Sequence, residues 1–206
     1  MITYAIFGAF GCLGALVAKA LATANKSRLQ GGIFAAIWFG LLALVAAATP
    51  APAKEIAYLV DGDMGGMMAD YQAKAETIGR TKIIIDGFCA SSCTLFLRDD
   101  WNLDVCYTDA ALLGFHKPFD WDEKGQVVTG ISAITLSDSA WKTWFFDHMP
   151  AGIRAKLKGQ QIPEPSAGDP VSRLFYIKAR DLHGTVKRCE RNWSSKYDLI
   201  NVEDVR

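Results

Sequence analysis

The chain changes character at residue 53, and this change sets how much of it can fold into a globular domain. The first 53 residues contain no acidic residue and only three of the 22 basic ones, Lys19, Lys26 and Arg28. The remaining 153 residues carry 19 basic and 22 acidic residues, a formal charge of −3. That is enough chain for one domain with a buried core. It lacks the basic excess of a nucleic-acid-binding protein, so we expect no nucleic-acid partner.

Two apolar stretches fill the first part of the chain. Residues 2–24 have about the length of a membrane span, and Lys19 near their end can snorkel to the interface. Residues 32–48 form the second stretch, and Lys26 and Arg28 lie between the two. Because positive charge stays on the cytoplasmic side, a membrane hairpin would keep this loop inside and export the domain after it.

A signal peptide is the alternative explanation of the same segment. Lys26 and Arg28 then form the basic n-region, residues 33–47 the apolar h-region, and Ala51-Pro52-Ala53 an A-x-A cleavage site. A retained hairpin and a cleavage after Ala53 both lead to export of the domain beyond residue 53. The sequence therefore predicts a membrane hairpin or signal segment at 1–53 and an exported domain at 54–206.

Four cysteines lie in the predicted exported domain, Cys89, Cys93, Cys106 and Cys189, whereas Cys12 lies in the first apolar stretch. An even number of cysteines in an oxidising compartment predicts two disulfides. A zinc site is the alternative. However, structural zinc sites normally show C-x-x-C pairs, and Cys89 and Cys93 form a C-x-x-x-C pair with no histidine nearby. We therefore expect disulfides and no metal.

Hydrophobic periodicity predicts an α/β domain with a parallel sheet. The first elements are a short apolar strand at 55–60, a glycine-rich turn at 61–66, a helix at 67–78 capped by Gly79, and a β-branched strand at 81–85. A strand, a helix and a second strand in this order form a βαβ unit, whose two strands lie parallel in one sheet.

The pattern beyond this unit predicts short strands followed by helices. The expected elements are a helix at 94–97, strands at 105–107 and 111–115, a loop at 117–129, a helix from Ser137 to Lys158 with a break near Pro150, a loop at 159–170, a last helix at 171–182 and a strand near 185–188. We see no internal repeat.

The segment 87–97, G-F-C-A-S-S-C-T-L-F-L, carries the candidates for chemistry. Ser91 and Ser92 lie where a predicted strand gives way to a helix. The unpaired N–H groups and the positive dipole end of a helix N-terminus stabilise a developing oxyanion. A junction of this kind is therefore a common place for a nucleophile.

A serine nucleophile needs a base, and the chain contains three histidines, His116, His148 and His183. His116 ends an apolar run, from where it can reach the end of a neighbouring strand. His148 fits a surface or packing position on an amphipathic helix. His183 precedes a glycine at a helix end, where a cation interacts favourably with the last carbonyls.

The segments around Ser91 and His116 resemble the proteolytic subunits of the Clp protease, within the ClpP/crotonase superfamily. Residues 89–94 (C-A-S-S-C-T) are similar to that family's A-A-S-M-G-A helix start. Residues 114–118 (G-F-H-K-P) are similar to its M-I-H-Q-P strand end, and Ser91 and His116 are 25 residues apart, as in the family. Residues 63–66 (D-M-G-G) resemble its S-P-G-G turn. A group of exported bacterial proteins with a C-x-S-x-C-T…C…G-F-H pattern is more similar still.

The resemblance implies a ClpP-like fold of parallel strands with flanking helices, and a serine hydrolase, in the first place a peptidase. It places Ser91 as the nucleophile, His116 as the base, and the amides of Gly66 and Ser92 as the oxyanion hole. It implies a peptide or acyl substrate, no cofactor, and a location in the inner membrane with a periplasmic domain, or in the periplasm after cleavage near Ala53. Homo-oligomeric rings are common in this superfamily.

The catalytic acid and the disulfide partners are left open by the sequence. In the family, the acid lies upstream of a final stretch that residues 179–186 (A-R-D-L-H-G-T-V) resemble. Asp169 is the nearest upstream aspartate, and Glu164 is the other candidate. Spacing alone does not determine the disulfides, although Cys106 suits Cys93 as a partner, which leaves Cys189 to pair with Cys89 or to stay free.

A binding or assembly module without catalysis, on the same fold, is the alternative function. In that case Ser91 only caps a helix, and His116 is a strand-end histidine whose hydrogen bonds are satisfied. The distance between the Ser91 hydroxyl and the His116 ring separates the two hypotheses, because a base must lie within hydrogen-bond reach of its nucleophile.

Overall fold

A computed structural model describes residues 53–128, 130–164 and 173–205. The chain divides between residues 53 and 54, and only the second part is described below. The predicted membrane hairpin or signal segment, Cys12 and Asp169 lie outside the described residues. None of the described helices combines the length and the apolar character of a membrane span.

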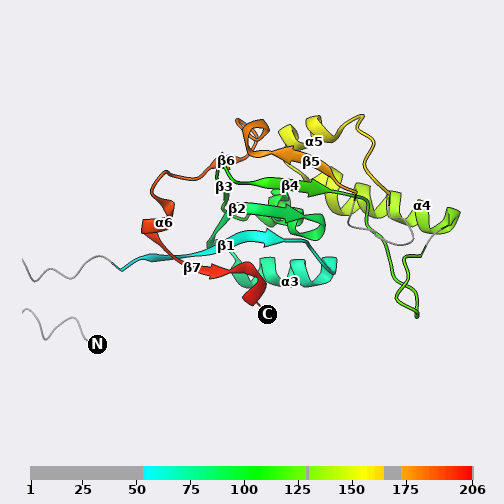
Figure 1. The fold of residues 1–206 in the computed structure, drawn as a ribbon, viewed down its shortest axis with the longest axis horizontal. Coiled ribbons are helices and arrows are strands. Elements are labelled where there is room, and N and C mark those ends of the chain that lie inside the picture. Colours follow the sequence, from blue (N-terminus) through cyan, green and yellow to red (C-terminus); the bar gives the residue numbers. More distant parts are fainter. Residues whose placement is uncertain (1–52, 129, 165–172, 206) are drawn as a thin grey trace, which may run out of the picture. The chain divides into compact units, whose positions relative to one another are not determined.

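A mixed α/β domain is built on a seven-stranded, mostly parallel sheet (Figure 1). Five strands follow one another in the order β5-β4-β2-β1-β7, while β3 pairs with β2 and β6 pairs with β3. Of these pairs, β4–β5 alone is antiparallel. The strands are β1 (Glu55–Asp63), β2 (Lys82–Ala90), β3 (Val105–Tyr107), β4 (Leu112–Phe115), β5 (Phe175–Lys178), β6 (Lys187–Arg188) and β7 (Tyr197–Asn201).

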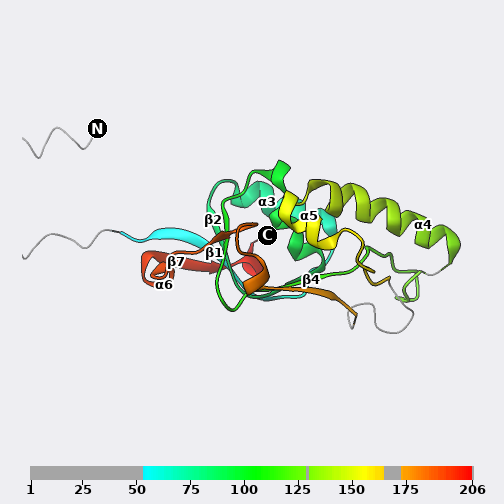
Figure 2. The ribbon, with the colours of Figure 1, turned by 90° about the horizontal axis from the view of Figure 1, so that it is seen from above.

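Short helices connect the strands, and Figure 2 shows α3 and α5 on the same side of the sheet. The α-helices are α3 (Met68–Ile78), α4 (Ile131–Ala140), α5 (Ala151–Leu157) and α6 (Trp193–Lys196). The 3₁₀-helices are η1 (Ser91–Leu97), η2 (Asp99–Trp101), η4 (Phe146–His148), η5 (Ala179–Asp181) and η6 (Val202–Asp204), and η3 (Trp141–Phe145) is a π-helical turn.

Strand β2 lies at the centre of the sheet because its apolar run is buried on both faces. Ile83, Ile84 and Ile85 are each 0% exposed. Ile83 and Ile85 belong to the main core, whereas Ile84 points to the other face and packs with Cys106 and Tyr197 in a smaller cluster. A continuous β-branched run of this kind is typical of a parallel strand covered on both sides. Burial of each isoleucine stabilises the fold by about 2 kcal/mol.

The predicted βαβ unit is confirmed, since β1 and β2 are parallel and α3 lies between them in the chain. The predicted break at Pro150 is also confirmed. The helix ends at His148 and α5 begins at Ala151, because proline has no N–H to continue the helical hydrogen bonds. The predicted helix start at Ser137 is wrong. Helix α4 begins at Ile131, and the buried Ser137 hydroxyl donates a hydrogen bond of 2.5 Å to the Pro118 carbonyl.

The helix predicted at 171–182 is also wrong. Its described part forms β5 and then η5. In β5, Ile177 is buried opposite Leu113 of β4, whereas Tyr176 and Lys178 on either side of it are exposed. This alternation with a period of two is typical of a strand. By pairing with β4, the segment forms hydrogen bonds with backbone groups of β4 that would otherwise lack partners. Strand β7, which the pattern did not predict, pairs with β1 in the same way at the other side.

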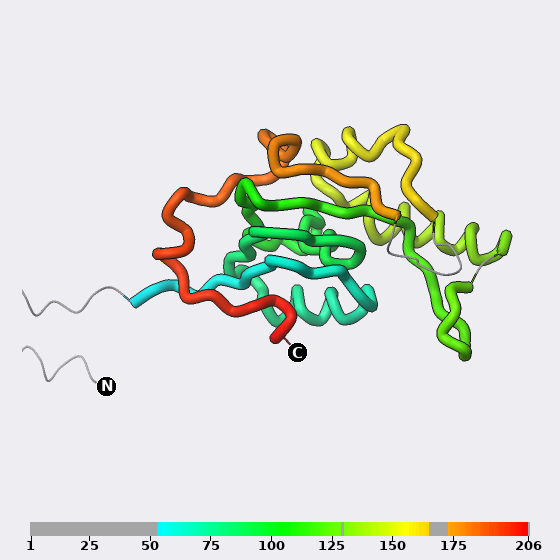
Figure 3. The backbone as a smooth tube through the Cα atoms, in the orientation of Figure 1, coloured from blue at the N-terminus to red at the C-terminus, as the bar shows by residue number. Residues whose placement is uncertain are grey.

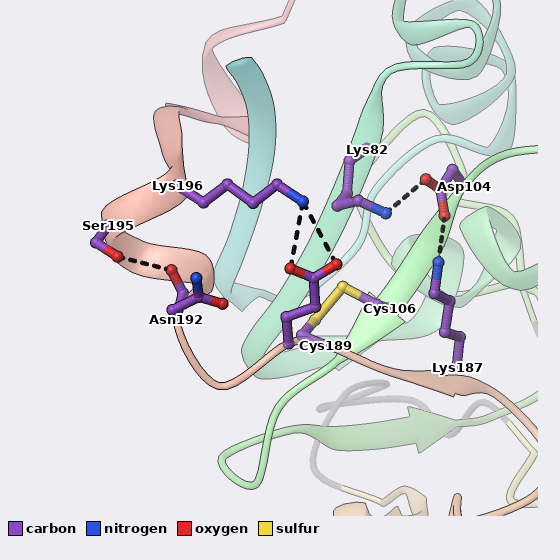
Figure 4. Close-up of polar contacts among 9 residues, drawn as sticks. Lys82, Asp104, Cys106, Lys187, Cys189, Asn192, Ser195 and Lys196 are labelled. Carbon is purple, nitrogen blue, oxygen red and sulfur yellow. Dashed lines mark hydrogen bonds and ion pairs between the residues drawn. A yellow bond between two sulfur atoms is a disulfide. The ribbon is translucent and has the colours of Figure 1, made fainter. Parts of the chain in front are cut away.

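Two disulfides are present, as predicted, but the suggested pairing of Cys93 with Cys106 is wrong. Cys89 bonds to Cys93, because the chain turns back at the start of η1 and brings their Cα atoms within 5.3 Å. Cys106 in β3 bonds to Cys189, because β6 pairs with β3 and Cys189 directly follows β6 (Figure 4). These four cysteines are all oxidised, so none of them is available as a zinc thiolate.

Candidate functional site

The three predicted site segments follow three neighbouring parallel strands, which Figure 3 shows side by side. The turn at 63–66 ends β1, Ser91 follows β2, and His116 follows β4. The register pairs Ala90 with Gly114, so Ser91 and His116 leave the sheet at the same edge. In open α/β sheets, ligands bind outside the carboxyl ends of the parallel strands. The order of the strands therefore brings the predicted residues to the edge where a site is expected.

Ser91 lies in strained backbone. Its φ is 53°, in the left-handed region that residues other than glycine rarely adopt. Strand β2 ends at Ala90 and η1 begins at Ser91, so a single residue makes the turn. The Cys89–Cys93 disulfide brackets this residue, and both cysteines are 0% exposed. Holding a serine in this conformation costs about 1–2 kcal/mol, and strain of this kind clusters at functional sites.

Gly65 packs directly against the Ser91 turn. Its φ is +85°, and a Cβ at this position would lie 2.7 Å from Ser91 Cβ and 2.8 Å from the Ser92 backbone nitrogen. The Ser92 hydroxyl donates a hydrogen bond of 2.7 Å to the Gly66 carbonyl. Neither the Gly66 nor the Ser92 N–H donates a hydrogen bond to another described residue. The turn after β1 and the start of η1 thus meet at the two amides that were predicted to form an oxyanion hole.

Asp63 is a residue of this site that the sequence reasoning missed. It is 3% exposed, and its Oδ1 accepts hydrogen bonds from the Gly65 N–H, at 2.8 Å, and from the Tyr71 hydroxyl. Its Oδ2 is buried with no hydrogen-bond partner among the described residues. Burial, with the hydrogen bond to Asp63, raises the pKa of Tyr71, which therefore stays a donor. The bond from the Gly65 N–H to the Asp63 side chain forms an Asx turn. An aspartate two residues before a glycine, directly after a strand, is a sequence signal of this turn.

The His116 ring is held in the form that a general base needs. It is 3% exposed, and its Nδ1 lies 2.8 Å from the Lys117 carbonyl oxygen. Because a carbonyl only accepts, Nδ1 carries the proton of the neutral ring and Nε2 keeps its lone pair. Nε2 is buried without a hydrogen-bond partner among the described residues. Burial also lowers the pKa of His116, which favours the neutral ring at pH 7.

The structure does not bring together the whole predicted triad. No hydrogen bond joins Ser91 to His116, because Nδ1 bonds to Lys117 and Nε2 has no partner among the described residues. Asp169 lies outside the described residues. Glu164 pairs with Lys117 Nζ at 2.8 Å, and neither ring nitrogen of His116 forms a hydrogen bond with it. Within the described residues, the partner of His116 Nδ1 is the Lys117 carbonyl and not a carboxylate.

The other two histidines lie away from this edge. His148 is at the surface, as predicted, with its Nδ1 3.2 Å from Asp100 Oδ2. The hydrogen bond from Arg98 lowers the pKa of Asp100, and the Arg98 guanidinium lies over the Trp101 ring. His183 is exposed in the turn after η5. The sequence-based choice of His116 as the histidine nearest to Ser91 in the sheet thus agrees with the strand order.

The buried, neutral His116 ring is expected to make the fold less stable in mild acid. The ordinary histidine pKa is about 6.5, and that of folded His116 is lower. Below pH 6.5 the unfolded chain therefore binds a proton that the folded chain does not. Stability falls as the pH drops from about 6.5 towards the folded pKa, by about 1.4 kcal/mol for each pH unit that separates the two pKa values.

Urea unfolding of the wild type and of His116→Gln at pH 7.5 and 5.5 measures this contribution. The wild type is expected to lose more stability between the two pH values than His116→Gln, because all other titrating groups are common to both. Equal losses would show that the His116 ring is not held neutral by burial.

Comparisons with protein-family models, with curated proteins and with solved structures find no match. The resemblance to the ClpP/crotonase superfamily therefore stays a sequence-based prediction. The function proposed below rests on the chemistry of the residues at this edge of the sheet.

Proposed function

We propose that the domain is an exported serine hydrolase that acts on peptides, with Ser91 as its nucleophile. The meeting of three features at one edge of the sheet supports this proposal: a strained serine, a glycine turn packed against it, and a buried neutral histidine after the adjacent strand. If Ser91 only capped η1, its backbone would not need the left-handed conformation. Sharp turns between a strand and a helix hold the nucleophile in other hydrolases.

In the proposed reaction, Ser91 Oγ attacks the acyl carbon while its proton passes to His116 Nε2. The N–H groups of Gly66 and Ser92 stabilise the negative charge that develops on the acyl oxygen. Collapse of this intermediate breaks the C–N bond, and His116 returns the proton to the leaving amine. Water, deprotonated by the same ring, then releases the acyl group from Ser91.

The Lys117 carbonyl would replace the catalytic acid in this proposal. It fixes the tautomer of His116 by accepting the Nδ1 proton, at 2.8 Å. A neutral carbonyl stabilises the protonated ring less than a carboxylate does, so we expect a slow dyad. Ser91 must also rotate towards His116, and catalytic hydrogen bonds are often absent or long until substrate binds.

Export and a ClpP/crotonase-like topology belong to the same proposal. The two disulfides support an oxidising compartment, because cytosolic thiols are kept reduced. The domain would then be held at the inner membrane by residues 1–53, or be released to the periplasm by cleavage after Ala53.

A binding module without catalysis is the second candidate. The observation in its favour is that Nε2 of His116 is enclosed and makes no hydrogen bond to Ser91. In such a module the serine turn and the histidine would only stabilise the edge of the sheet, and Ser91 would be no more reactive than a surface serine.

Labelling of the oxidised full chain with a fluorophosphonate separates the two candidates. We expect the wild type to be labelled, Ser91→Ala to lose the label, and His116→Gln to react at least about 100-fold more slowly. The matched control is Ser92→Ala, which removes a neighbouring hydroxyl that is already bonded to Gly66 and should keep the label. A folded wild type that takes no label, or a label that survives in Ser91→Ala, would reject the hydrolase.

A further inference from the structure

A hollow of about 970 Å³ opens beside the candidate base. One of its lining residues is Lys117, which directly follows His116 and whose carbonyl oxygen lies 2.8 Å from Nδ1 of that ring. The Lys117 N–H donates a hydrogen bond of 2.9 Å to the carbonyl of Pro163, another lining residue. The hollow and the base are therefore joined through the backbone of one residue. The volume lies within the usual range of ligand pockets.

The apolar lining of the hollow is held in place by packing. Trp141, a half-buried lining residue, stacks on Phe145 with the ring centroids 5.5 Å apart. Its ring also meets Phe115 of β4 edge to face. Ile162, a second apolar lining residue, is 6% exposed. Because Trp141 is packed by two other rings, it offers a fixed apolar surface to the aliphatic part of a ligand.

The charged lining of the hollow is mostly basic and consists of Lys117, Lys142, Lys158, Arg173 and Glu164. Lys117 and Lys142 already pair with carboxylates. Lys158 and Arg173 are exposed, and neither forms an ion pair with another described residue. Because residues 54–206 carry a formal charge of −3, two such cations at one hollow are a local feature and do not reflect a basic domain.

Two amide side chains add neutral polar groups to this lining. Gln160 and Gln161 both line the hollow and are exposed. A glutamine amide donates and accepts hydrogen bonds, so it can pair with either polar group of a peptide backbone. A nucleic acid is a poor ligand, because its phosphates need an extended basic surface and the domain as a whole is acidic. The two cations, the aromatic ring and the amides together suit a peptide segment with acidic side chains.

We propose that this hollow binds an acidic segment of a peptide, and that Lys158 and Arg173 determine this specificity. An arginine guanidinium holds a carboxylate by two parallel hydrogen bonds, whereas a lysine ammonium acts as a point charge. Trp141 takes the apolar part of the same segment. That this peptide is the substrate of Ser91 rests on the proposed function, whereas binding in the hollow does not require the reaction.

A pair of matched peptide probes tests this inference in the oxidised full chain carrying Ser91→Ala, which removes the proposed nucleophile. One probe contains several glutamates, the other has lysines in their place, and both carry the same neutral fluorophore. Fluorescence anisotropy measures their affinities. We expect the glutamate peptide to bind at least about tenfold more tightly than the lysine peptide, because the lysine peptide meets like charges in the hollow.

Replacing both cations, by Lys158→Gln with Arg173→Gln, should weaken binding of the glutamate peptide at least about tenfold. Because both side chains are exposed, the fold should persist. The matched control, Lys178→Gln with Arg180→Gln, removes the same charge from exposed residues outside the hollow and should have no effect. If the double variant unfolds, a glutamate peptide that carries photoreactive benzoylphenylalanine replaces it, and cross-links are expected within residues 141–164.

Equal affinity for the two peptides, an unchanged affinity in the double variant, an equal loss in the control, or cross-links outside residues 141–164 would each overturn the inference. Inorganic polyphosphate that binds as tightly as the glutamate peptide would also overturn it, by showing a general anion site. Fluorophosphonate labelling of the wild type separates failure of this inference from failure of the proposed hydrolase. A labelled wild type without glutamate-peptide binding rejects the hollow alone, whereas peptide binding by a chain that takes no label rejects the hydrolase alone.

Discussion

Replacing both Cys106 and Cys189 with alanine is expected to lower the free energy of unfolding by about 4–5 kcal/mol. This disulfide joins residues 83 apart in the sequence, so its loss frees a long loop in the unfolded chain. Replacing Cys89 and Cys93, whose separation is 4, should cost only about 2 kcal/mol on the same basis. Urea unfolding of the oxidised proteins measures both values, and the second pair is the matched control for the first.

The position of the Cys106–Cys189 bond adds to its expected effect. Strand β6 has two residues, and among the described strands it pairs only with β3. The polar contacts around the bond in Figure 4 are largely exposed ion pairs, such as Lys187 with Asp104 and Lys196 with Glu190, and exposed ion pairs contribute little to stability because water and salt screen them. The disulfide is thus the main link between the C-terminal segment and β3. Equal losses for the two cysteine pairs would contradict this interpretation.

If the proposed hydrolase is correct, loss of the two disulfides should affect folding stability and the reactivity of Ser91 in opposite order. Loss of the Cys89–Cys93 bond removes the smaller amount of stability, but it frees the backbone on both sides of the left-handed Ser91. Fluorophosphonate labelling should therefore fall more in the Cys89/Cys93 variant than in the Cys106/Cys189 variant, under conditions where both are folded.

The central elements could be predicted from the sequence because their signals are local. The run Ile83-Ile84-Ile85 is buried on both faces, and the helix before it has its own periodicity. Pro150 breaks a helix by its covalent structure alone. The edge strands β5 and β7 give no such signal. Each is short and half exposed, and each is defined by a partner far away in the chain, β4 for one and β1 for the other.

The candidate site divides in the same way. The neighbourhood of Ser91 and His116 follows from two strands that lie side by side in a parallel sheet, and the motifs predicted it. The bond between Cys89 and Cys93 could not be derived because it depends on the sharp turn at Ser91, and the role of Asp63 could not because it depends on its burial. The positive φ of Ser91 accompanies a close approach of the turn at 63–66 to η1. That approach is a tertiary contact between segments 25 residues or more apart.

The close contact between the turn at 63–66 and the start of η1 makes Gly65→Ala the most informative single substitution at the site. Its Cβ would lie 2.7 Å from the Ala90 carbonyl oxygen and from Ser91 Cβ, and the φ of +85° is itself unfavourable for alanine. Overpacking against backbone costs about 1–3 kcal/mol and the conformation about 1–2 kcal/mol. We expect a loss of roughly 3 kcal/mol in the free energy of unfolding, measured by urea unfolding.

Gly66→Ala is the matched control, because the neighbouring glycine has no such constraint. A Cβ at Gly66 would meet only the edge of the Tyr71 ring, at 3.7 Å, and its φ lies outside the left-handed region. It also keeps the backbone N–H that the proposed oxyanion hole uses. Gly66→Ala should therefore lose less than about 1 kcal/mol and keep its fluorophosphonate label, whereas Gly65→Ala should displace Ser91 and lose it. If Gly65→Ala is as stable and as reactive as Gly66→Ala, the contact between the two turns does not position Ser91, and the proposed reaction loses its main geometric support.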